Sequence, residues 1–117
     1  MKQDASQFLP LSAASLYILL ALASDDLHGY GIMQEVARQS EGQYKIGPGT
    51  LYDNLKKLVS QGLVAETVHR PSADDPGRRY YRLNALGRGV LSAEVERVEG
   101  VLREAKTHLR GLKPRRA

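Results

Sequence analysis

The C-terminal third of the chain repeats an apolar side chain at alternating spacings of four and three residues, and this repeat restricts the fold more than any other feature. Positions at that spacing form one stripe along an α-helix, like the seam of a coiled coil. The helix is predicted to begin at Asn84, a good capping residue, and to end at about Leu112. At about 1.5 Å per residue its length is roughly 40 Å, more than a small domain buries alone. The seam comprises Leu91, Val95, Val98, Leu102, Ala105, Leu109 and Leu112.

Two interpretations of this seam stay open. The helix either packs along its own domain or pairs with the same helix of a second chain, and the length of the seam favours pairing. Contacts with the first helix of either subunit are also expected, because that helix is apolar on more than one side. The residues predicted to form the contact of a homodimer are therefore Leu16, Leu20, Leu91, Val95, Val98, Leu102, Ala105 and Leu109.

Three shorter helices are predicted in the first half of the chain. The first covers about residues 12–23 and is capped by Ser12. The second carries an apolar stripe and stops before Gly42. The third lies between Gly47, which can cap it, and Gly62, which closes it.

The third helix has one apolar and one polar side. Leu51, Leu55 and Leu58 share a face at spacings of four and three residues, so they are predicted to turn inward. A lysine pair on the opposite face is, taken alone, typical of a solvated helix surface. That face carries Thr50, Asp53, Lys56, Lys57 and Ser60, with Tyr52 on its flank.

A β-hairpin is predicted next. The run LVAETVH alternates and is rich in β-branched residues, RPSADDPGR is typical of a turn, and RYYRLN resumes an extended pattern. Tyr81 and Leu83 are predicted to face the core, and Tyr80 and Arg82 the solvent. Three helices followed by a hairpin describe a winged helix-turn-helix, so the expected fold class is mainly α with a small β-hairpin and a long C-terminal helix. The expected domains are residues 1–84 for DNA binding and residues 85–117 for dimerisation, with a basic tail.

The positive charge of the chain is concentrated in its centre. The formal net charge is +4, and residues 45–88 hold eight Lys and Arg against four Asp and Glu. In a winged helix the third helix enters the major groove, so its lysines and the arginines of the hairpin tip are spaced to meet phosphates on both sides of the groove. Coincidence of the two clusters favours DNA binding over a merely solvated face. The predicted DNA contacts are Lys45, Thr50, Tyr52, Lys56, Lys57, Arg70, Arg78 and Arg79.

Other functional classes have weak support in the sequence. The chain has no cysteine, which excludes disulfides and thiolate metal sites. His28, His69 and His108 are expected in a loop, a strand and a helix, too scattered for a metal site, and no nucleophile has an obvious base. We therefore expect no cofactor and no enzyme. The longest apolar run, residues 16–23, is far shorter than the roughly 20 residues of a membrane span, so a soluble cytoplasmic protein is expected.

Three stretches, HGYGI, GPGTLYDNLKKLVSQGLV and RRYYRLNALG, resemble the PadR family of bacterial transcriptional regulators in order and spacing. The resemblance extends from about Leu16 to Leu91, and the chain is similar in length to short members with a single C-terminal helix. It implies a homodimer that binds a pseudo-palindromic operator as a repressor and is released by a small aromatic or phenolic effector. By that similarity Gly49, Thr50, Leu51 and Tyr52 occupy the Gly-Thr-Leu-Tyr signature of the recognition helix, which adds Gly49 to the DNA contacts.

The resulting hypothesis is a dimeric, ligand-responsive DNA-binding repressor. A winged-helix adaptor that holds a protein partner, without sequence-specific DNA binding, is the alternative. The two differ in their expected behaviour, because each phosphate neutralised contributes about −0.9 to the slope of log affinity against log salt concentration. An adaptor would retain DNA only weakly and without sequence preference.

Overall fold

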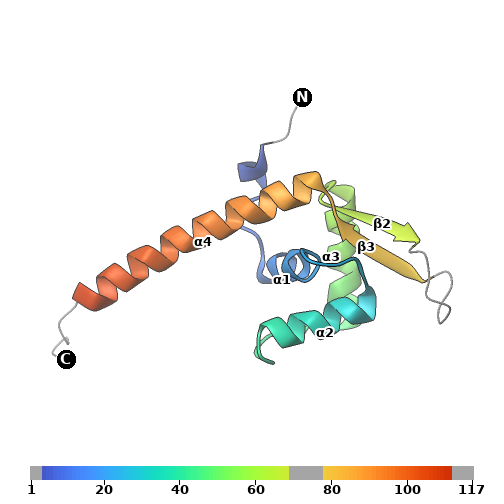
Figure 1. The fold of residues 1–117 in the computed structure, drawn as a ribbon, viewed down its shortest axis with the longest axis horizontal. Helices are drawn as coiled ribbons and strands as arrows, with labels where there is room; N and C mark the ends of the chain where they lie inside the picture. Colours follow the sequence, from blue (N-terminus) through green and yellow to red (C-terminus); the bar gives the residue numbers. More distant parts are fainter. Residues whose placement is uncertain (1–3, 69–77, 112–117) are drawn as a thin grey trace.

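The fold follows the predicted order of three helices, a hairpin and a long final helix (Figure 1). The computed structural model describes residues 4–68 and 78–111. These residues are mainly helical, with one small antiparallel sheet, as predicted. The elements are the 3-10 helix η1 (Ala5–Phe8), α1 (Ala13–Ala21), β1 (Leu27–His28), α2 (Gly29–Gln39), α3 (Pro48–Ser60), β2 (Val64–Val68), β3 (Arg79–Leu83) and α4 (Ala85–Gly111).

The helices begin and end at the residues that the sequence marks for these roles. The backbone N–H of Ser15 donates to Ser12 Oγ at 3.1 Å, and that of Gly87 donates to Asn84 Oδ1 at 3.0 Å, so both predicted caps are confirmed. Gly62 takes a φ of +81° just after α3, a conformation that glycine adopts without strain. The first helix ends two residues earlier than expected, at Ala21.

The core lies between α1, α2, α3, the sheet and the first turns of α4. Leu51, Leu55 and Leu58 are fully buried, which confirms the predicted inward face of α3. In the sheet, Tyr81 and Leu83 are buried and Arg82 is exposed, as alternation predicts. Because α1 packs against α2, α3 and α4, its apolar sides are covered largely within one chain.

The sheet has one strand more than the predicted hairpin. Its order is β1-β3-β2, with both neighbours antiparallel to β3, and Leu27 lies opposite Tyr81. The expectation that His28 lies in a loop is therefore wrong. A strand of two residues is too short to show alternation in the sequence, and its existence depends on the edge that β3 offers. His28 also caps α2, because its Nδ1 accepts the Gly31 N–H at 3.0 Å.

The long helix α4 belongs only partly to this core. Val90 and Leu91 are buried by the rest of the chain, whereas the helix beyond Glu94 is exposed and extends past α1 (Figure 1). Glu94 is 1% exposed and accepts the backbone N–H of Leu11 at 3.1 Å. Arg97, one turn along α4, donates to the same carboxylate at 2.7 Å. The N-terminal segment with η1 is thereby held against α4 at the point where the exposed half begins.

Candidate nucleic-acid interface

The outer face of α3 is open to solvent. Because the three leucines fix the rotation of the helix, the polar residues between them point away from the core. Asn54 donates from Nδ2 to the Thr50 carbonyl at 2.8 Å, a contact within the helix. Every predicted DNA contact before and on α3 is exposed, namely Lys45, Gly49, Thr50, Tyr52, Lys56 and Lys57. Asp53, on the same face of α3, is exposed as well.

The wing strands β2 and β3 carry the second cationic group. Arg78 and Arg79 are exposed at the start of β3, and Arg70 lies outside the described residues. Arg79 Nη1 lies 2.5 Å from Oε2 of Glu66 on the neighbouring strand. The hydrogen bond to this carboxylate raises the pKa of Arg79. Burial raises the pKa of Tyr81, whose hydroxyl lies 3.5 Å from the same Glu66 oxygen, and the Glu66 charge raises it further.

A cleft of about 250 Å³ lies between α3 and the wing. Lys56 from α3 and Arg79 from β3 both line it, together with Tyr52 and Glu66, and we call it the wing cleft. The structure thus brings one lysine of the helix and one arginine of the wing to the same surface depression. Lys57 is exposed on α3 but does not line this cleft.

Sequence reasoning missed Glu66 and Tyr30 in this region. Glu66 and Tyr81 are cross-strand partners. Alternation along β2 predicts which face of the strand Glu66 occupies, but not the register of β2 and β3 that brings Glu66 close to Arg79. Tyr30 is 62% exposed in the first turn of α2. The nearest Lys or Arg to Tyr30 in the sequence is Arg38, so no local pattern marks Tyr30 as part of a basic surface.

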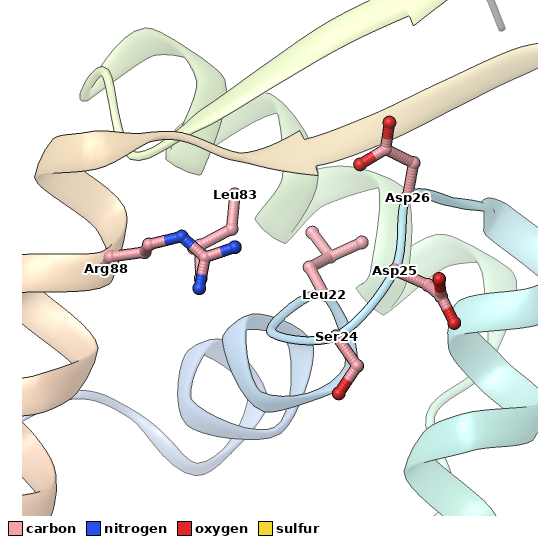
Figure 2. Close-up of a pocket in the computed structure, with 6 residues that line it drawn as sticks. All are labelled: Leu22, Ser24, Asp25, Asp26, Leu83 and Arg88. Atoms are coloured by element: carbon pink, nitrogen blue, oxygen red, sulfur yellow. The ribbon is translucent and has the colours of Figure 1, made fainter.

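A second cleft lies where α1, β3 and α4 meet, and Figure 2 shows the residues that line it. Asp25 and Asp26 come from the connection after α1, and Arg88 from α4. Asp26 accepts from Arg82 Nη2 at 2.8 Å, and Arg88 Nη1 lies 3.4 Å from the Ala23 carbonyl. With two carboxylates in its wall, this cleft is poorly suited to a phosphate.

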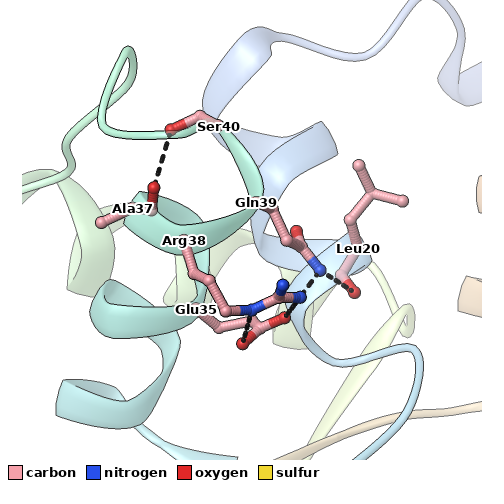
Figure 3. Close-up of polar contacts among 6 residues, drawn as sticks. All are labelled: Leu20, Glu35, Ala37, Arg38, Gln39 and Ser40. Atoms are coloured by element: carbon pink, nitrogen blue, oxygen red, sulfur yellow. Dashed lines mark hydrogen bonds and ion pairs between the residues drawn. The ribbon is translucent and has the colours of Figure 1, made fainter.

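The end of α2 is tied to α1 by polar contacts (Figure 3). Gln39 Nε2 donates to the Leu20 carbonyl at 3.4 Å and to Glu35 Oε2 at 3.1 Å. Arg38 forms an ion pair with Glu35 at 2.6 Å. The hydrogen bond from Arg38 lowers the pKa of Glu35. Of these contacts, the hydrogen bond from Gln39 to Leu20 joins α2 to α1, and the others lie within α2.

Two classes of site are absent from residues 4–68 and 78–111. No group of three or more His, Asp or Glu there is placed to hold a metal ion. None of the helices in these ranges has both the length and the apolar character to cross a membrane.

Comparison with known proteins gives concordant results. The sequence profile of the transcriptional regulator PadR-like family matches residues 18–93. The transcriptional regulator Rv3488 of Mycobacterium tuberculosis is 33% identical over 93 residues, which cover 80% of this chain and 82% of that protein. A PadR-like transcriptional regulator from Bacillus cereus has a similar fold, with a TM-score of 0.74 at 20% identity over 92% of this chain and 100% of that one. Bacillus subtilis PadR in complex with operator DNA superposes with a TM-score of 0.63 at 21% identity, over 74% of this chain and 48% of that one.

Proposed function

Because the chain belongs to the PadR-like family of transcriptional regulators, we propose that it is a repressor that binds a pseudo-palindromic operator as a homodimer and is released by a small aromatic ligand. Membership of this family makes it a DNA-binding regulator of transcription and not an enzyme. The repressor role, the dimer and the effector are the parts that this proposal adds.

The wing cleft is the observation that carries the proposal. Lys56 of α3 and Arg79 of β3 line it together, so a duplex with α3 in its major groove meets cations on the helix and on the wing. A protein of similar fold, Bacillus subtilis PadR, has been crystallised in complex with operator DNA, which supports the proposal that this chain also binds an operator. The proposed DNA contacts are Lys45, Gly49, Thr50, Tyr52, Lys56, Lys57, Arg70, Arg78 and Arg79.

The exposed half of α4 supports the proposed homodimer. Val95, Val98 and Leu102 lie along one stripe and are open to solvent in the single chain, and Leu109 is 71% exposed. A stripe of this kind is stable in water when a second helix covers it. The proposed contact residues are Leu16, Leu20, Leu91, Val95, Val98, Leu102, Ala105 and Leu109, of which Leu91 is already buried by its own chain.

Release by a ligand follows from the geometry of a dimer on DNA. Two recognition helices fit successive major grooves when they are roughly 34 to 36 Å apart, one turn of the duplex. A small aromatic molecule that binds between the subunits and favours another spacing lowers operator affinity by the difference between its affinities for the two arrangements. The proposed division is residues 1–84 for DNA and residues 85–117 for dimerisation.

The test begins with recovery of genomic fragments that the purified full-length protein retains, followed by fluorescence anisotropy with the recovered duplex. We expect specific binding that weakens steeply with salt. Lys56→Ala with Lys57→Ala should reduce both affinity and salt slope, the slope by about 0.9 for each phosphate that the variant no longer neutralises. A matched control is Arg103→Ala with Arg110→Ala, which removes the same charge from exposed positions of α4. If the wild type retains DNA only without sequence preference, the adaptor alternative replaces the regulator.

A further inference from the structure

A third cleft opens where the start of α2, the flank of α3 and the wing meet. Its volume is about 290 Å³, and we call it the tyrosine cleft. It adjoins the wing cleft, because Tyr52, Arg79 and Tyr81 line both. The residues that line the tyrosine cleft are His28, Gly29, Tyr30, Tyr52, Arg78, Arg79 and Tyr81.

Gly29 fixes the position of Tyr52 at this cleft. Gly29 is buried at the first position of α2, and a Cβ built on it would lie 2.0 Å from Tyr52 Oη and 2.7 Å from Tyr52 Cζ. The end of the tyrosine ring therefore occupies the space that any other side chain at position 29 would need. This close fit joins α2 to α3 at the outer surface and sets where the Tyr52 hydroxyl lies.

The lining of the tyrosine cleft suits an anion. It contains two guanidinium groups, Arg78 and Arg79, and no carboxylate among the described residues that line it. The wing cleft instead includes Glu66, and the cleft near Arg88 includes Asp25 and Asp26. Glu66 pairs with Arg79 from the wing-cleft side, so Arg79 is shared between the two clefts.

The phenolic side chains of this cleft are accessible to a ligand. Tyr30 is 62% exposed and Tyr52 is 48% exposed, so a ligand in the cleft can reach both side chains. A tyrosine hydroxyl donates one hydrogen bond and carries no charge at neutral pH. Such donors are among the side chains that contact phosphate oxygens of DNA.

We infer that the tyrosine cleft holds one phosphate of the DNA backbone, with the hydroxyls of Tyr30 and Tyr52 as donors and Arg78 and Arg79 as the balancing charge. This inference rests on the proposed function and adds to it a second surface beside the recognition helix, contributed by α2. Gly29 is a positioning residue in this account, because it acts through Tyr52.

The inference is tested with the duplex recovered by the wild-type protein, by anisotropy and by replacing single phosphates with uncharged methylphosphonates. Tyr30→Phe should weaken binding by roughly tenfold or more, since each subunit then makes one hydrogen bond fewer to a charged group. The salt slope should stay unchanged because tyrosine carries no charge. At one phosphate per half-site, the methylphosphonate should weaken Tyr30→Phe by a smaller factor than it weakens the wild type, because the variant has already lost the Tyr30 hydrogen bond to that phosphate.

Gly29→Ala gives a second, independent arm. The added methyl displaces an exposed side chain, not the backbone, so the variant should keep its melting temperature while its affinity falls. In a Tyr52→Ala background the same substitution should cost no further affinity, because the clash is gone. Gly89→Ala is the control, since a Cβ there meets nothing within 4 Å.

The outcomes separate the inference from the proposed function. If the wild type binds no duplex with sequence preference, the proposed function fails first. Suppose that the wild type binds specifically, but that Tyr30→Phe and Gly29→Ala bind with the same affinity and no methylphosphonate position affects the wild type and Tyr30→Phe differently. The tyrosine cleft then does not bind a DNA phosphate. The inference would likewise be overturned if free inorganic phosphate occupied the tyrosine cleft while the methylphosphonate pattern on DNA stayed unchanged. The cleft would then be a site for a small anion and not for the DNA backbone.

Discussion

At the scale of single residues, one buried carboxylate holds the N-terminal segment on α4. Glu94 accepts the Leu11 N–H and two hydrogen bonds from Arg97. Glu94→Ala removes these acceptors and leaves a part-buried N–H unpaired, so we expect a loss of about 1 to 3 kcal/mol in the free energy of unfolding. Glu94→Gln keeps one acceptor and should lose less. Urea denaturation measures both, with Glu99→Ala on the exposed side of α4 as control; equal stability of wild type and Glu94→Ala would contradict the role assigned.

The same residue predicts how stability depends on pH. The hydrogen bonds from Arg97 hold the pKa of Glu94 below its ordinary value of 4.5 in the folded protein. A group with a lowered folded pKa contributes its full stability above the unfolded value and loses it as the pH falls through the folded one. The difference in unfolding free energy between wild type and Glu94→Gln should therefore be constant at neutral pH and shrink below about pH 4.5. A difference that grows on acidification would show the opposite sign and refute this linkage.

At the scale of elements, the start of α4 depends on close contact with the connection between α3 and β2 and with the end of β3. A Cβ on Gly87 would lie 2.1 Å from the Leu63 carbonyl oxygen and 2.7 Å from Leu83 Cδ1. Because the nearer obstacle is backbone, Gly87→Ala should cost about 1 to 3 kcal/mol by overpacking, although alanine favours a helix. Gly89→Ala, two residues along the same helix and in open space, should be neutral or stabilising by up to about 1 kcal/mol. Thermal unfolding compares them, and an equal rise in both melting temperatures would rule out the close contact.

The elements also show which features a sequence can reveal. Some features depend on neighbours within a few residues, and local patterns predicted them. Periodicity predicted the inward leucines of α3 and the alternation of β3, and residue type predicted the caps Ser12 and Asn84. Other features depend on contacts between segments that lie far apart in the sequence. These are the strand β1, the burial of Glu94 and the fit of Gly29 to Tyr52. Glu94 accepts from a residue 83 positions away, and no local pattern encodes that distance.

The candidate site follows the same division. Its lysines were predicted because the rotation of one helix is set locally, and the exposed outer face of α3 agrees with that prediction. Its clefts were not predicted, because they form only where α2, α3 and the wing come together. The roles of these residues in DNA binding stay predictions that the proposed experiments test.

At the scale of the whole molecule, a single chain is elongated, with extents of 62 × 39 × 22 Å, and the exposed half of α4 accounts for much of that shape (Figure 1). A stripe of exposed valine and leucine on a projecting helix favours association with a second apolar surface. Pairing would also bring two DNA-binding surfaces, each on a chain of net charge +4, into one particle. A variant that cannot dimerise is therefore expected to lose affinity for DNA and part of the salt dependence of binding as well.

Leu102→Glu tests that coupling, because it places a charge on the proposed seam at a half-exposed position that the winged domain does not need. The variant should sediment as a monomer at micromolar concentration, where we expect the wild type to sediment as a dimer, and it should keep the same fold by circular dichroism. Its affinity for the recovered duplex should fall, and its salt slope should be about half that of the wild type, since one subunit contacts half of the phosphates. Thr107→Glu adds the same charge to α4 away from the seam and serves as the control. It should stay in the same oligomeric state as the wild type, and its salt slope should change by no more than one added negative charge per subunit predicts. A wild-type monomer, or a Leu102→Glu dimer with the full slope, would mean that α4 does not form the contact between subunits.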